Sequence, residues 1–273
     1  MSGDGAGGFG VGGAAGVGGA AGVGGAAGVG GGAGGGGYTG DVEPEGPAAV
    51  RVLDEVVLRK LSVGPMDNGA YVLACRRTGA RLLVDAAAEP DRLLDLVRAG
   101  SPGDVPPGPL ALVVTTHRHR DHLGALAAVL AATGAPHAAG ADDAAAVAEA
   151  AGTTAPRALA HGDVVEVGAL RLEVVALRGH TPGAVALAYR EPGDARAPGA
   201  VPGRVHLLTG DSLFPGGPGR TADPAAFGSL MADLEDRVFG RFPDDTWVYP
   251  GHGRDTTLGA ERPHLTRWRA RGW

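Results

Sequence analysis

The sequence predicts an α/β (α+β) protein built as a four-layer αββα sandwich, with two β-sheets packed together and helices on both outer faces. Two observations support this fold class. Strand-like segments fall into two runs, within residues 50–139 and 163–249, and helix-like segments accompany each run. A helix and a sheet each bury one face against a neighbour. Two sheets that each have their own helices are therefore expected to pack as four layers.

The first run contains apolar and β-branched residues in alternation, which is typical of strands. Thr78-Gly79 provides a turn inside its second segment. Helices are expected where apolar residues recur with a period of 3.6 or where alanine dominates. The expected strands are residues 50–63, 70–85, 110–114 and 136–139, and the expected helices are residues 90–99, 123–132 and 142–151.

The second run follows the same logic, with glycine turns between its strands. Asp223 precedes a helical pattern and is expected to cap that helix, because a short carboxylate can accept a hydrogen bond from the first turn. The expected strands are residues 163–167, 170–177, 184–189, 205–208 and 247–249, and the expected helices are residues 224–239 and 258–271.

The N-terminal 46 residues differ in composition from the rest of the chain. They are dominated by Gly, Ala and Val, and a Gly-Val-Gly-Gly-Ala-Ala hexad recurs within them. Ordering such a backbone costs more conformational entropy than the burial of small side chains returns. We expect residues 1–46 to form a disordered low-complexity tail and residues 47–273 to form one domain. Upstream sequence that the native protein does not translate is the other interpretation of the tail.

Composition limits the classes of partner and location. The net charge is −6 and no stripe of Lys and Arg is present, so we expect no nucleic-acid partner. No stretch of 18 apolar residues occurs, so we expect no membrane span. Cys75 is the sole cysteine and is expected to be a small buried hydrophobic residue. A chain without an internal disulfide fits a reducing, cytoplasmic location.

The most informative motif is Thr-His-Arg-His-Arg-Asp-His at residues 116–122. It places three imidazoles and a carboxylate directly after the expected buried strand 110–114 and before a helix. Imidazole together with carboxylate suits zinc, iron or manganese better than calcium or magnesium. In layered α/β proteins, sites are built at the carboxyl ends of strands. The motif therefore predicts a metal site formed by His117, His119, Asp121 and His122.

Three later segments share one pattern, in which an apolar strand ends in a ligand-type residue beside glycine. These residues are His180, Asp211 and His252. The small neighbours allow the backbone to approach an ion closely. With the first motif they supply five imidazoles and two carboxylates, which is a ligand set for two adjacent metal ions. The histidines at 137, 161, 206 and 264 lack a partner motif and are expected to be structural.

In this order, these motifs resemble the metallo-β-lactamase superfamily, and within it the glyoxalase II-like hydroxyacyl-thioester hydrolases. The resemblance implies a hydrolase domain over residues 47–273 with the αββα fold. It also implies two divalent metal ions, zinc first, with iron and manganese as alternatives. Asp67-Asn68-Gly69 resembles a structural loop of the family. The resemblance divides the ligands into His117, His119 and His180 for one ion, Asp121, His122 and His252 for the other, and Asp211 as the bridge.

The resemblance implies metal-dependent hydrolysis of a small-molecule acyl thioester by a hydroxide that bridges the two ions. Asp121 and Asp211 are the catalytic carboxylates of this hypothesis. A thiolate leaves without a proton because the pKa of a thiol is near 8.5. An amine would need an acid, for which metal-bound Asp121 is the one candidate. Arg220 stands where the family has a lysine, and it is a candidate anchor for a substrate carboxylate or a solvated loop residue.

Other functions remain open at this point. The Gly219-Arg220-Thr221 loop also resembles the persulfide dioxygenases of the same superfamily, which would use one iron held by His117, His180 and Asp211. Lactone and β-lactam hydrolysis need the same hydroxide. RNA cleavage is disfavoured by the acidic charge. Outside enzymes, the alternative is a catalytically silent metal-binding regulatory protein, although a purely structural zinc site needs only four ligands.

Overall fold

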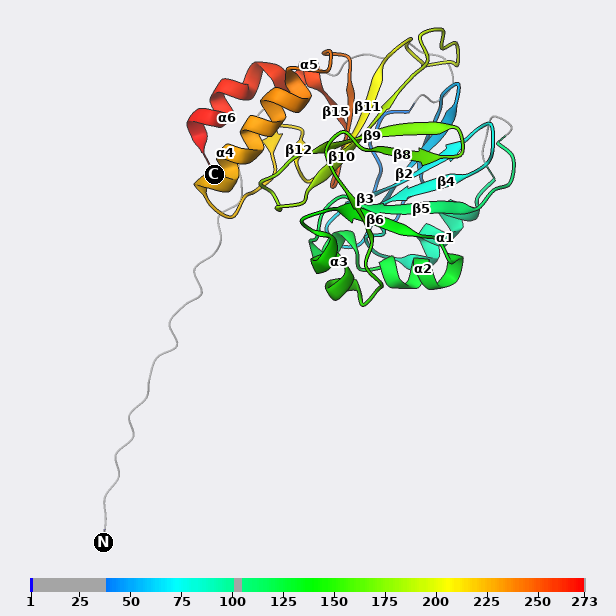
Figure 1. Ribbon diagram of the computed structural model, residues 1–273, viewed down its shortest axis with the longest axis horizontal. Helices are drawn as coiled ribbons and strands as arrows, with labels where there is room; N and C mark the ends of the chain where they lie inside the picture. The colour runs from blue at the N-terminus through cyan, green and yellow to red at the C-terminus, as the bar shows by residue number, and fades with distance from the viewer. Residues whose placement is uncertain (2–37, 101–104, 273) are drawn as a thin grey trace. The chain divides into compact units, whose positions relative to one another are not determined.

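The computed structural model describes Met1 and residues 38–100 and 105–272. The sheets and helices all belong to one unit of the chain, Gly36–Trp273 (Figure 1). Most of the expected disordered tail, residues 2–37, lies outside the described residues. No helix in the described part of the chain is both long and apolar enough to cross a bilayer.

Tyr38, which falls within the expected tail, packs against the domain. Its hydroxyl donates a hydrogen bond to Asp255 at 2.8 Å, and its ring lies 6.1 Å from the ring of Trp247. The guanidinium of Arg51 lies 4.9 Å from the centre of the Tyr38 ring. Tyr38 thus contributes a large aromatic contact area to the domain.

One sheet has seven strands within the described residues, in the order β1-β2-β3-β4-β5-β6-β7. The pairs β1–β2, β2–β3 and β3–β4 are antiparallel, and the pairs β4–β5, β5–β6 and β6–β7 are parallel. Parallel neighbours need crossover connections, which are mostly helical here. The strands are β1 (Ala49–Val52), β2 (Val56–Val63), β3 (Asn68–Cys75), β4 (Arg81–Val84), β5 (Leu110–Thr115), β6 (His137–Gly140) and β7 (Arg157–Leu159).

The other large sheet has six strands in the described part of the chain, in the order β15-β14-β11-β10-β9-β8. Its pairs are antiparallel apart from β11–β14, which is parallel. A small hairpin of β12 (Leu213–Phe214) and β13 (Gly217–Pro218) follows β11. The strands of the large sheet are β8 (Val164–Val167), β9 (Leu170–Ala176), β10 (Val185–Arg190), β11 (Val205–Gly210), β14 (Trp247–Pro250) and β15 (Thr256–Thr257).

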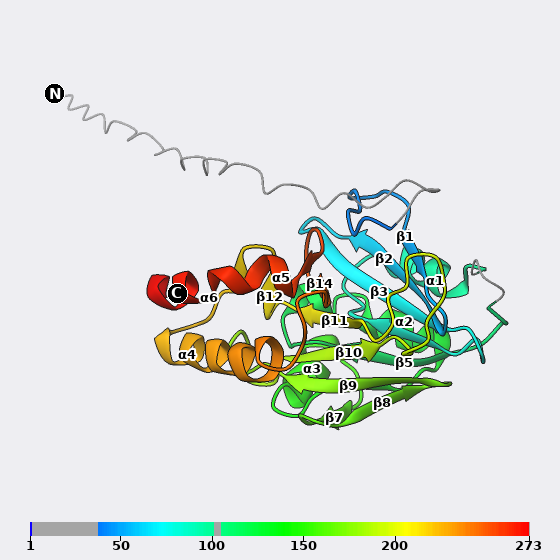
Figure 2. The same cartoon turned by 90° about the horizontal axis from the view of Figure 1, so that it is seen from above.

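Helices cover the outer face of each large sheet (Figures 1 and 2). Leu93, Leu126 and Val147, from the first three helices, share one core with Val72 and Val113 of the seven-stranded sheet. The later helices form a separate core with the six-stranded sheet. The helical segments are α1 (Pro90–Arg98), η1 (Arg120–His122), α2 (Leu126–Thr133), α3 (Ala144–Ala151), α4 (Pro224–Asp233), η2 (Leu234–Phe239), α5 (Leu258–Glu261), η3 (Arg262–His264) and α6 (Leu265–Arg271).

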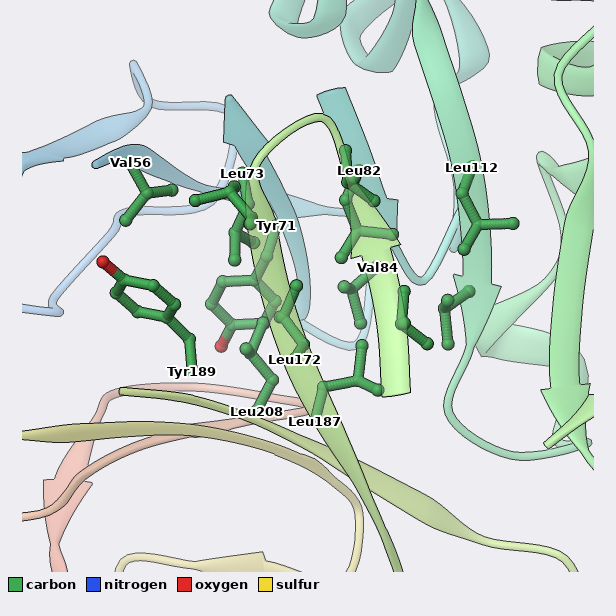
Figure 3. Close-up of a cluster of buried hydrophobic side chains, with 14 of the residues drawn as sticks. Val56, Tyr71, Leu73, Leu82, Val84, Leu112, Leu172, Leu187, Tyr189 and Leu208 are labelled. Atoms are coloured by element: carbon green, nitrogen blue, oxygen red, sulfur yellow. The ribbon is translucent and has the colours of Figure 1, made fainter. Parts of the chain in front are cut away.

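A third core lies between the two sheets (Figure 3). Along β3, Tyr71 and Leu73 point into this core, whereas Ala70 and Val72 point toward the helices. This alternation follows from the period of two in a strand. Because both faces are covered, β2 and β3 are buried at every position. The three cores confirm the four-layer αββα prediction.

The structure differs from the predicted elements mainly at their ends. The expected strand 50–63 is two strands, because Asp54-Glu55 makes a turn in which Leu53 N–H donates to Val56 at 2.9 Å. The expected last helix is three short segments, and its middle segment begins around Pro263, which cannot donate a backbone hydrogen bond. Asp223 caps α4 as predicted, by accepting a hydrogen bond from Ala226 N–H. The short strands β7, β12, β13 and β15 were not predicted.

The inter-sheet core gives a direct test of stability. Leu187 in β10 is fully buried and pairs with Leu208 of β11. We expect Leu187→Ala to lower the free energy of unfolding by about 2–5 kcal/mol, because it removes buried apolar surface and leaves a cavity. Val164→Ala, at a site 39% exposed, should change it by less than about 0.5 kcal/mol. Urea unfolding measures both, and equal effects would contradict this packing.

Candidate metal centre

Seven side chains meet where strands of both sheets end, and we call them the His/Asp cluster. Each of these residues comes shortly after the end of a strand. Four lie in the segment after β5 that includes η1, one lies in the β9–β10 loop, and one each follows β11 and β14. This placement is the one expected from the sequence. The cluster consists of His117, His119, Asp121, His122, His180, Asp211 and His252.

Three imidazoles form the first ligand group, His117, His119 and His180. His117 Nε2 lies 3.1 Å from His119 Nδ1 and 3.3 Å from His180 Nε2. His117 is buried, whereas His119 is exposed. The group therefore has one side fixed in the protein and one side open to solvent.

The second ligand group is Asp121, His122 and His252. His122 Nε2 lies 3.1 Å from His252 Nε2, and Asp121 Oδ2 lies 3.2 Å from His252 Nε2. The remaining residue, Asp211, lies between the two groups. Its Oδ1 is 3.3 Å from His122 Nε2, and its Oδ2 is 3.5 Å from His180 Nε2 and 3.4 Å from His252 Nε2.

The hydrogen-bond partners of the rings determine which nitrogen faces the cluster. His180 Nδ1 lies 2.6 Å from the carbonyl of Arg220, and His252 Nδ1 lies 2.8 Å from the carbonyl of Met66. A carbonyl can only accept, so each Nδ1 carries the proton. His122 Nδ1 is bound in the same way to Asp85 Oδ2 at 2.9 Å. Fixing the Nδ1 tautomer leaves Nε2 of each ring available as a ligand.

Several atoms that face one another in the cluster are hydrogen-bond acceptors, so a proton or a cation has to lie between them. His122 and His252 face each other through their Nε2 atoms while both Nδ1 positions are occupied by protons. Asp211 Oδ1 is buried and has no hydrogen-bond partner of good geometry among the described residues. Unshielded lone pairs at this distance repel one another, and a cation between them removes that repulsion. The residues therefore fit a metal ion in both chemistry and arrangement.

The electrostatics of the cluster separate the two groups. Burial lowers the pKa of His117 well below its usual value, and the nearby His122 adds to this effect. Burial also acts to lower the pKa of His122, but Asp121, Asp211 and Asp85 outweigh it and raise that pKa well above the usual value. Burial opposes the ionisation of Asp211, yet His122 and His252 hold its pKa well below the usual range. The raised pKa of His122 means that a proton competes with a metal ion for this ring.

Glycine permits the close approach that the sequence suggested at two positions. A Cβ on Gly251 would collide with the Asp211 carboxylate and with His122. Gly210 has a φ of +48°, and a Cβ there would run into the side chain of Thr116. Any larger residue would push β11 or β14 away from the cluster.

Sequence analysis missed Asp85, which lies directly after β4. Its side chain accepts hydrogen bonds from Thr116 N at 2.7 Å and from Thr116 Oγ1 at 2.8 Å, in addition to the contact with His122. It also has a φ of +59°, which is rare for residues other than glycine. Its position after a buried strand, like that of Asp211, is the signal that could have identified it.

Asn68 and Asp143 also act on the cluster without belonging to it. The expected structural loop 67–69 is in contact with the site, because Asn68 Nδ2 donates to Asp121 Oδ2 at 3.0 Å. Asp143 is fully buried and accepts hydrogen bonds from Arg118 N–H, Thr181 Oγ1 and Gly183 N–H. It thereby joins the loop of His117 to the loop of His180. No sequence pattern marked this link, because Asp143 lies before an ordinary alanine-rich helix.

Arg220 is at the edge of the cluster with its side chain exposed. Its carbonyl accepts the hydrogen bond from His180, so the backbone of this loop is held next to the first ligand group. The histidines that were expected to be structural do not belong to the cluster. His206, for example, is buried between Glu191 and Tyr249.

Comparison with known proteins agrees with this geometry. Residues 63–252 match the model of the metallo-beta-lactamase superfamily, and the chain belongs to this superfamily. The match begins at the last residue of β2 and ends at His252, so it contains the whole His/Asp cluster.

Individual relatives are similar over most of the domain. A hydroxyacylglutathione hydrolase from Polaromonas sp. (strain JS666) is 33% identical over 190 residues, which are 68% of this chain and 62% of that relative. The match thus covers less than two-thirds of the relative's own length. ETHE1 from Myxococcus xanthus is 28% identical with a TM-score of 0.61, over 78% of this chain and 84% of that one. The protein TTHA1623, solved in a di-iron-bound form, is 33% identical with a TM-score of 0.54, over 74% and 96%.

The role of Asp85 can be tested by an isosteric change. In Asp85→Asn, an amide nitrogen facing His122 would favour the tautomer with the proton on Nε2, which cannot bind metal. We expect zinc affinity to fall roughly 10–100-fold, as for other partners of ligand histidines. Chelator competition measures this affinity, with the exposed-turn variant Asp163→Asn as the control. Equal affinities in the two variants would show that Asp85 does not set the tautomer of His122.

Proposed function

We propose that this protein hydrolyses acyl thioesters of a small thiol, with two divalent metal ions held by the His/Asp cluster. Zinc is our first choice of metal, with iron or manganese as alternatives, since the donor set is compatible with all three. The substrate would be a small molecule, and we place the reaction in the cytoplasm. The observation that carries the proposal is the position of Asp211 between two complete ligand groups.

The relatives support both parts of this proposal. The name hydroxyacylglutathione hydrolase describes cleavage of an acyl–thiol bond, and that relative shares 33% of its residues with this chain over the match. The di-iron form of TTHA1623 supports occupancy by two ions. A pair of bound ions would supply a water of lowered pKa and a polarised carbonyl.

The protonation state of Asp121 favours a thioester over an amide. Its pKa is held well below the usual range, first by the hydrogen bond with His122 and also by the one from Asn68. At neutral pH Asp121 is therefore a carboxylate, which accepts hydrogen bonds and has no proton to give. A thiolate leaves without a proton, whereas an amine does not. For this reason the β-lactam alternative is the weaker one.

Asp211 and Arg220 have different roles in the proposal. Asp211 would hold the two ligand groups at a fixed separation, because its two oxygens face different rings. Arg220 would bind a carboxylate of the thiol carrier, for which its planar guanidinium is suited. Its loop is attached to the first ligand group through His180.

A second candidate is a mononuclear iron enzyme that oxidises a persulfide. The supporting observation is the compact set of His117, His180 and Asp211, in which the Asp211 carboxylate lies 3.9 Å and 3.5 Å from the two rings. Two histidines and one carboxylate form the usual site of oxygen-activating iron. One iron per chain, with oxygen uptake on a persulfide, would replace the hydrolase proposal.

Removing the carboxylate that lies between the two ligand groups tests the hydrolase proposal. We expect Asp211→Ala to lower kcat/KM for thioester hydrolysis by at least roughly 10³-fold, because both ligand groups lose their shared anion. Initial rates on glutathione, mycothiol and coenzyme A thioesters, with zinc-replete protein, provide the measurement. The exposed-site variant Asp236→Ala should keep the wild-type rate. A metal-replete wild type that is inactive on all three thiols would instead favour a regulatory role.

The pKa differences predict that the two ligand groups respond differently to pH. His122 and His252 have raised pKa values, so protons compete with metal at the second group until the pH exceeds those values. The pKa values of His117 and His119 are lowered, so these rings are already deprotonated at neutral pH. Between pH 6.5 and 8 we expect affinity at the second group to rise roughly tenfold per pH unit for each displaced proton.

The first group should show little change over this window. Zinc titrations against a chromophoric chelator at several pH values resolve the two binding steps. Parallel pH dependence of both steps would contradict the assignment of protons to the second group.

A further inference from the structure

We infer that residues 38–40 form a strap that completes a buried ion pair, Lys60–Asp255, and that this pair positions the loop of His252. The strap, Lys60 and Asp255 all lie outside residues 63–252, the part of the chain that matches the superfamily. They therefore connect the segments that flank the matched region to the loop of His252, a member of the His/Asp cluster.

Lys60 is the centre of this arrangement. Its side chain is 2% exposed, although it lies in the middle of β2. The ammonium donates to Asp255 Oδ1 at 2.6 Å, to the Gly253 carbonyl at 2.6 Å and to the Gly40 carbonyl at 2.8 Å. An ammonium has three protons, so all of its donors are used. One of them binds the strap, and another binds the peptide next to His252.

Asp255 is satisfied from the other side. Its side chain is 1% exposed, and its Oδ2 accepts hydrogen bonds from Tyr38 OH at 2.8 Å and from Trp247 Nε1 at 2.7 Å. A buried carboxylate is costly unless its oxygens are hydrogen-bonded. Tyr38 therefore contributes one of the bonds that satisfy this pair in its buried position.

The pair is coupled to His252 through the backbone. Gly253, whose carbonyl binds Lys60, donates its N–H to the Asp67 carbonyl at 3.1 Å. His252 Nδ1 binds the Met66 carbonyl beside it. Movement of the residue 253 peptide would thus change both the direction of the His252 ring and its tautomer-fixing bond. Tyr38 and Lys60 act here as positioning residues, because neither touches the cluster.

Two pairs of variants test the strap with matched controls. Tyr38→Phe removes the hydroxyl bound to Asp255, and Tyr189→Phe removes a comparable buried hydroxyl bound to Glu55. Gly40→Ala would drive a Cβ into Asp255 at a φ of +76°. Gly203→Ala has nearly the same φ, +75°, with nothing within 4 Å, so it reproduces the backbone strain without the collision.

The first measurement is hydrogen exchange of residues 250–255 in metal-free protein. We expect exchange to be roughly tenfold faster in Tyr38→Phe and Gly40→Ala than in their controls, as for the loss of one hydrogen bond to a charged group. Unchanged exchange in both variants would overturn the strap. This readout does not depend on metal, so it stands even if the proposed function fails.

The second measurement is zinc affinity by chelator competition, and it rests on the proposed metal site. We expect the binding step of the second ligand group to weaken roughly tenfold in both strap variants, with the other step unchanged. Faster exchange with both steps at wild-type affinity would overturn the positioning of His252. Equal weakening of both steps would also overturn it, since the effect would then be global.

Discussion

The structure depends on the convergence of nitrogen and oxygen lone pairs around Asp211. His122 and His252 point their Nε2 atoms at each other and at this carboxylate, while their Nδ1 protons are already bound to other oxygens. Without a cation, a proton on His122 or His252 relieves the arrangement, and the pKa values of both rings are raised, that of His122 by Asp121, Asp211 and Asp85. The fold must supply enough packing energy to hold such a group together.

The two-sheet architecture supplies that support. The cluster lies at one end of strands from both sheets, so three packed cores fix the backbones that carry its residues. Buried carboxylates then connect the loops: Asp85 orients His122, and Asp143 joins the His117 and His180 loops. The packed cores therefore place the backbone of each ligand, and the hydrogen bonds to buried carboxylates orient its side chain and loop.

The sequence predicted the layers and all seven members of the cluster, because the motif at residues 116–122 and the three ligand-type residues beside glycine at strand ends are local patterns. It did not predict Asp85, Asp143 or the contact of Asn68 with Asp121, since these depend on which loops meet in three dimensions. The contact of Tyr38 with the domain could not be predicted for the same reason. Its hydroxyl binds Asp255, which lies 217 residues later in the chain. Strand ends were also misjudged where a single turn, such as Asp54-Glu55, divides an apolar run.

The central claim is that the cluster holds a pair of metal ions with Asp211 between them. The most direct measurement is the metal content of protein purified without added metal, determined by inductively coupled plasma mass spectrometry. The account predicts about two divalent ions per chain, as in other two-metal hydrolytic sites. One ion per chain, or none after incubation with excess zinc, would contradict it.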